Sequence, residues 1–168
     1  MPKLYPVPSA TLVASSGGEF RLDALRENVV VYDFIFTRCS GTCPLMTTSM
    51  NRLVKRIDQK LPVRFVTITV DPTHDSPSVL QQFARRQGND PRWIFLTGDA
   101  SEITDLSVKG FKLAAGPGGG AGSEVLIHSS KLVLADRGGQ IRGYYDGTDP
   151  QAVEKLRNDI RDLAVERG

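Results

Sequence analysis

Apolar runs alternate with amphipathic segments along this chain, and the alternation predicts both strands and helices. Runs rich in β-branched and aromatic residues, typical of buried strands, occupy 29–36, 63–70, 93–96, 131–135 and 140–145. Apolar residues at helical spacing predict helices from Pro44 to about residue 60, near 100–108, after Ser76-Pro77 and after Asp149-Pro150. Segments 11–14 and 19–22 flank a Ser-Ser-Gly-Gly turn and predict a hairpin.

The order of these elements indicates the fold class. Strand, helix, strand, helix and strand, followed by a hairpin and a last helix, is the order of a thioredoxin-like α/β fold. We therefore expect a central mixed sheet flanked by helices, with an N-terminal β-hairpin at about 9–23. The length suits one domain over residues 1–168. Glycines at 116–122 lack the Lys-Ser/Thr pair of a phosphate-binding loop and predict a flexible loop.

Composition narrows the possible partners. The net charge is only +2 and basic residues are spread along the sequence, which argues against a nucleic-acid partner. No apolar run approaches the roughly 20 residues that a membrane span needs, and the first eight residues lack the apolar core of a signal peptide. The chain as written is expected to be soluble, and an ectodomain taken from a longer precursor would give the same pattern.

The two cysteines of the chain, Cys39 and Cys43, are the strongest sign of chemistry. A disulfide between them would close a very short loop and stabilise the fold little. Cys39 lies in the loop after the first long strand, and Cys43 lies where the next helix begins, so the helix dipole is expected to favour a thiolate. Two nearby thiolates are soft ligands that suit copper(I), zinc or iron–sulfur chemistry.

Histidine supplies the candidate third ligand. His128 directly precedes the strand at 131–135, and in a thioredoxin-like fold the loop entering that strand faces the cysteine loop. Taken alone, His128 fits an ordinary hydrogen-bonded histidine. Two thiolates and an imidazole suit trigonal copper(I), copper(II) would want a further ligand, and structural zinc prefers four protein ligands. His74 fits a surface turn, and Asp75 is a possible carboxylate beside the metal ligands.

The chain resembles the Sco/SenC family of copper-binding proteins over about residues 9–165. The resemblance rests on four segments: Phe36-Thr37-Arg38-Cys39 to Cys43-Pro44, Val70-Asp71-Pro72 with Asp75 and Pro77, Arg92-Trp93-Ile94 to Leu96-Thr97-Gly98-Asp99, and His128-Ser129. It implies a copper ion, Cu(I) or Cu(II), held by Cys39, Cys43 and His128.

The same resemblance implies a role and a location. The expected role is copper delivery to, or thiol reduction of, the binuclear copper site of cytochrome c oxidase or another copper protein. The expected location is extracytoplasmic, in the periplasm or on the outer face of the inner membrane, with an N-terminal membrane anchor outside this chain. Two departures bear on partner recognition and metal affinity: Ile127 stands where family members often carry Asp, and the loop before His128 is rich in glycine.

Three other functions fit parts of the pattern. A thiol–disulfide oxidoreductase would use Cys39 and Cys43 as a redox pair, although such enzymes usually have Cys-x-x-Cys and a proline where Ser130 stands. A peroxiredoxin would need Pro and Thr at the positions of Tyr32 and Phe36, which excludes that class. Redox sensing or signalling with a vestigial metal site stays open.

Overall fold

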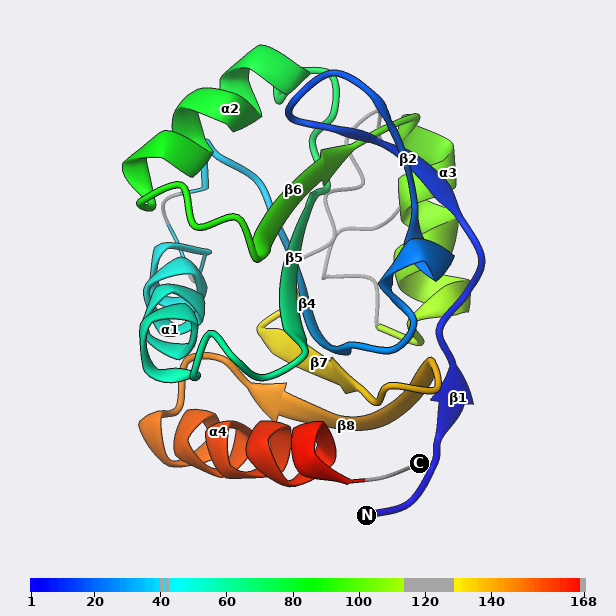
Figure 1. Cartoon of the computed structure of the whole chain (residues 1–168). Coiled ribbons are helices and arrows are strands. Elements are labelled where there is room, and N and C mark those ends of the chain that lie inside the picture. The colour runs from blue at the N-terminus through cyan, green and yellow to red at the C-terminus, as the bar shows by residue number, and fades with distance from the viewer. Residues whose placement is uncertain (40, 42, 114–128, 167–168) are drawn as a thin grey trace.

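The computed structural model describes residues 1–39, 41, 43–113 and 129–166. Three parallel strands form the centre of its sheet: β4 (Val29–Ile35), β5 (Val63–Thr69) and β6 (Trp93–Thr97) (Figure 1). Every residue of β4 is buried, as its nearly continuous apolar run predicts. The loop that follows the carboxyl end of β4 therefore starts from a fully buried strand.

Antiparallel strands extend this centre on both sides into one mixed sheet. β7 (Lys131–Ala135) pairs with β4 and with β8 (Gln140–Asp146), and the short β1 (Tyr5–Pro6) borders β8. On the other side β2 (Thr11–Ala14) pairs with β6 and with β3 (Glu19–Arg21), which confirms the predicted hairpin. The strand order is β1-β8-β7-β4-β5-β6-β2-β3.

Helices cover both faces of the sheet. On one face lie α1 (Cys43–Arg56), α2 (Pro77–Arg86) and α4 (Pro150–Val165), and on the other α3 (Ala100–Asp105) continues into a π turn, η2 (Leu106–Gly110). A 3-10 turn, η1 (Leu22–Leu25), follows the hairpin. Met46 and Met50 of α1 are fully buried, so these methionines are core residues, as their helical spacing predicts.

Local capping explains where these helices begin and end. The Ser76 hydroxyl accepts the Val79 N–H at the start of α2, and the Asp149 carboxylate accepts the Gln151 N–H at the start of α4. The expectation that the first helix reaches about residue 60 is wrong: α1 ends at Arg56, because Asp58 accepts the Lys60 N–H and turns the chain.

The glycine-rich segment 116–122 lies outside the described residues. Within the described part of the chain, no helix is both long and apolar enough to span a bilayer.

Candidate metal centre

The two cysteines lie at the carboxyl end of the central strand, where β4 passes through a loop into α1. Cys43 is the first residue of α1 and is 8% exposed, whereas Cys39 lies in the loop and is half-buried. Both are free thiols. The carboxyl ends of parallel strands are the usual binding edge of an α/β sheet. The structure therefore places a pair of soft ligands at that edge.

Burial decides the protonation of Cys43. Removal from water is the main cause that raises the pKa of its thiol to about 12, and a hydrogen bond with the Cys39 thiol acts in the same direction. Burial therefore favours a protonated Cys43 in the metal-free protein, against the thiolate that the helix N-terminus predicts. A metal ion that binds here must displace the Cys43 proton.

A buried carboxylate, Asp75, holds the cysteine loop in place. Asp75 is 0% exposed and accepts the Thr37 backbone N–H at 3.0 Å, the Thr37 hydroxyl, and the Thr69 hydroxyl at 2.6 Å. Thr37 is two residues before Cys39. Asp75, predicted as a carboxylate beside the metal ligands, thus fixes the backbone of the loop that carries Cys39.

A second link joins the same two loops. The Arg38 guanidinium donates to the Asp71 carboxylate at 2.7 and 3.2 Å, and the Asp71 backbone N–H donates to the Thr69 hydroxyl at 3.0 Å. The Arg38 side chain is 57% exposed, so this ion pair contributes little to the free energy of unfolding. Its role is to hold the two loops in position relative to each other. His74 is exposed in the adjoining turn, as its sequence position indicates.

Beneath α1 lies a charged residue that the sequence pattern does not single out. Asp33 of β4 is fully buried, accepts the Thr67 hydroxyl at 2.6 Å on one oxygen, and has no partner among the described residues for the other. Burial raises the pKa of the Asp33 carboxyl to about 7, and the charge of Asp33 raises the pKa of Cys43. The only sequence signal for Asp33 is an acidic residue inside a buried apolar run.

The chain also enters β7 at the cysteine end of the sheet. The Gly147 N–H donates to the Ser130 carbonyl at 2.7 Å, and the Ser49 hydroxyl of α1 donates to the Gly147 carbonyl at 2.7 Å. A Cβ placed on Gly147 would lie 3.3 Å from both the Ser130 carbonyl oxygen and the Met46 side chain. Residues 129–130 are therefore packed near the first turns of α1.

His128, the predicted third ligand, lies outside the described residues. Among the residues that the structure describes, no three Cys, His, Asp or Glu side chains form a group that could hold a metal ion. The structure thus brings Cys39 and Cys43 together and places Asp75 behind their loop.

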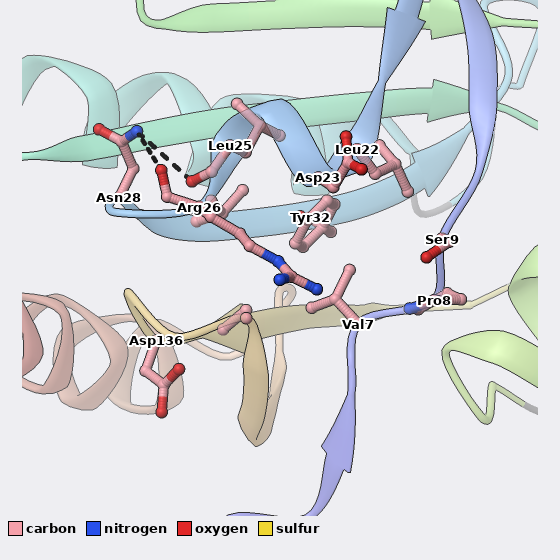
Figure 2. Close-up of a pocket in the computed structure, with 13 residues that line it drawn as sticks. Val7, Pro8, Ser9, Leu22, Asp23, Leu25, Arg26, Asn28, Tyr32 and Asp136 are labelled. Carbon is pink, nitrogen blue, oxygen red and sulfur yellow. Dashed lines mark hydrogen bonds between the residues drawn. The ribbon is translucent and has the colours of Figure 1, made fainter. Parts of the chain in front are cut away.

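A small pocket lies near the start of β4, on the face opposite α1. Figure 2 shows Arg26 between Val7 and Tyr32 in this pocket, with Asp136 at its border. Its open volume is about 20 Å³, room for about one water molecule. A small-molecule substrate does not fit there.

Together, the sheet order and the two thiols at a strand-to-helix turn define a dithiol protein of the thioredoxin-like fold. Comparison with known sequences gives the family: the sequence model of SCO1/SenC matches residues 7–164. A SCO1 protein homolog of Bacillus subtilis is 32% identical over 171 residues, which cover 98% of this chain and 86% of the relative. The chain belongs to the SCO1/SenC family.

Solved structures agree with this assignment. A SCO1/SenC family lipoprotein from Bacillus anthracis has a TM-score of 0.84 and 31% identity, and the match covers 95% of each chain. BsSco, described with a disulfide switch as a member of the Sco family of cytochrome c oxidase assembly proteins, has a TM-score of 0.82 and 30% identity over 99% of this chain and 98% of that chain. Yeast Sco1, solved with copper bound, shares the fold at a TM-score of 0.69 and 24% identity over 95% of this chain and 90% of that chain.

Proposed function

We propose that this protein binds one copper ion through Cys39, Cys43 and His128 and acts in the maturation of the copper site of cytochrome c oxidase. The observation that carries the proposal is the pair of free thiols at the start of α1, beside the point where the chain enters β7. Residue 128 precedes the first residue of β7, Lys131, by three residues, which supports His128 as the third ligand. The copper bound to yeast Sco1 supports the choice of metal.

The chemistry of the donor set fits copper. Two thiolates and one imidazole are the ligands that a trigonal copper(I) site takes, and structural zinc prefers four protein ligands. Cys39 and Cys43 would supply the sulfur ligands, and copper would displace the Cys43 proton that burial otherwise retains. Asp75 would keep the Cys39 loop in one conformation, because its two hydrogen bonds from Thr37 hold the segment just before the ligand and its bond from Thr69 ties it to the end of β5.

A second candidate function is thiol–disulfide exchange with the cysteines of a partner. The hydrogen bond between the Cys39 and Cys43 thiols favours it, and BsSco is described with a disulfide switch. Cys39 would attack the partner disulfide because it is the more exposed thiol, and Cys43 would then close the intramolecular disulfide. Two electrons and two protons would pass to the partner, which leaves with two thiols.

We further propose that the protein works outside the cytoplasm and is tethered to a membrane. The similarity to a SCO1/SenC family lipoprotein supports this location. The binuclear copper site of cytochrome c oxidase, or the site of another copper protein, is the proposed recipient.

A copper titration of the reduced protein tests the proposal. Wild type is expected to bind one copper(II) ion with strong thiolate-to-copper absorption, and His128→Ala to lose affinity and change the spectrum. His74→Ala is the matched control, because His74 is the other histidine of the chain and is exposed. An unchanged spectrum in His128→Ala would refute the three-ligand site. Catalytic reduction of a partner disulfide by a protein that retains no copper would favour the second function.

A further inference from the structure

An open groove is lined by residues of α1 and α4. These two helices lie next to each other on one side of the molecule (Figure 1). The volume of the groove is about 420 Å³, and its lining comes from α1, from the first turns of α4 and from Thr148 just before α4. Leu45 and Val153 provide apolar surface, and neither cysteine lines it. The groove is large enough for side chains of another molecule and is distinct from the proposed ligand set.

The groove begins next to the dithiol. Leu45, which lines it, is two residues after Cys43 and is 57% exposed. The other exposed large apolar side chains of the described residues lie near the chain ends, at Met1, Leu4, Tyr5 and Val165. Arg52 lies about 14 Å from Cys43 along the axis of α1, at about 1.5 Å per residue. A molecule in the groove would therefore extend toward the sulfur ligands.

Positive charge dominates the rim of the groove. Three guanidinium groups, those of Arg52, Arg56 and Arg157, face a single carboxylate, that of Glu154. Glu154 pairs closely with Arg157 and lies 3.8 Å from Arg56. Arg52 makes no ion pair or hydrogen bond with another described residue. The groove thus presents excess positive charge, and Arg52 is available to pair with a carboxylate of another molecule.

We propose that this groove docks an acidic segment, with an apolar side chain among its carboxylates, of the protein that exchanges copper or electrons with Cys39 and Cys43. The identity of that partner rests on the proposed function. The carboxylates would pair with Arg52 and Arg56, and the apolar side chain would contact Leu45 and Val153. A protein segment fits better than a bilayer surface, because the site is concave and runs alongside a helix that begins at the dithiol.

The test uses the reduced, metal-free chain and a blocked synthetic peptide of roughly ten residues, with leucine flanked by aspartate and glutamate. Amide shifts on titration are expected to map to α1 and α4. Arg52→Glu is expected to weaken binding about tenfold, and Leu45→Ser to weaken it less. Arg85→Glu is the matched control, an exposed arginine on α2, and is expected to bind as wild type. Affinity is expected to fall as salt is added.

Several outcomes would overturn the docking proposal. One is equal binding of a peptide that has asparagine and glutamine in place of its acidic residues. Another is an equal loss of peptide affinity in Arg52→Glu and Arg85→Glu. A third is amide shifts in α1 and α4 that grow with protein concentration when no peptide is present. Binding to phosphatidylglycerol vesicles through Arg52 without peptide binding would also contradict it, because it identifies a lipid surface. A Cys39→Ser, Cys43→Ser double variant separates this proposal from the copper proposal. It is expected to bind the peptide as wild type while the copper titration fails.

Discussion

Replacing Asp33 with asparagine is expected to stabilise the reduced protein above neutral pH and to leave its stability nearly unchanged near pH 4. An asparagine side chain at this position would have the size of the aspartate and could still accept the Thr67 hydroxyl, which donates to Asp33 at 2.6 Å. Of the properties that vary with pH, the substitution removes only the ionisation of residue 33. Any change in the pH dependence of unfolding therefore reports the cost of the buried charge.

The magnitude follows from the pKa of Asp33, which burial raises from 3.8 to about 7. A carboxyl with a raised pKa binds its proton more tightly in the folded than in the unfolded chain, so stability falls as pH rises between these two values. Each pH unit in that interval costs about 1.4 kcal/mol, which amounts to on the order of 4 kcal/mol above pH 7. Carboxylates with lowered pKa, such as Asp136, are present in both proteins and cancel in the difference.

Urea unfolding at a series of pH values, with a phosphine to keep both thiols reduced, measures this difference. Asp33→Asn should match wild type near pH 4 and exceed it progressively toward pH 8. Asp105→Asn is the control: its carboxylate is 64% exposed and 3.5 Å from Lys109, so a change within about 0.5 kcal/mol is expected at every pH. A stability difference between Asp33→Asn and wild type that does not vary with pH would refute the reasoning.

Three further predictions concern the loop, the helix cap and the thiols. Asp75→Ala should destabilise the protein by about 3 kcal/mol in urea unfolding, because three donors lose their acceptor. Asp75→Asn should destabilise it less, and equal losses of stability in the two variants would contradict this explanation. Ser76→Ala should lower stability by about 0.5–1 kcal/mol through loss of the α2 cap, and a neutral effect would argue against that cap. Each single variant leaves one thiol for iodoacetamide: Cys39 in Cys43→Ser, and Cys43 in Cys39→Ser. Cys39 should react about tenfold faster or more, because burial raises the pKa of the Cys43 thiol to about 12. Equal alkylation rates of the two variants would be inconsistent with that environment.

Local patterns were sufficient to predict the elements that carry the cysteines. The apolar run at 29–36 became β4, and Pro44 lies in the first turn of α1, where its missing N–H costs no hydrogen bond. The length of α1 was overestimated because Ile57 continues the apolar spacing beyond the helix end. Spacing alone does not reveal the Asp58 turn that ends the helix.

Contacts between distant segments could not be predicted from the sequence. Asp33 lies opposite Thr67 only because β4 and β5 adopt one particular parallel register, which no single strand specifies. Likewise, Thr37 and Asp75 are far apart in sequence and meet through the packing of two loops. The docking groove also arises from tertiary packing, since α1 and α4 are each ordinary amphipathic helices in the sequence.

X-ray absorption of the copper(I)-loaded protein tests the central claim most directly. The account predicts a first shell of two sulfur atoms and one nitrogen atom in wild type and in His74→Ala, with the nitrogen lost in His128→Ala. Retention of that nitrogen in His128→Ala, or a shell without two sulfurs in wild type, would contradict a copper site built from Cys39, Cys43 and His128.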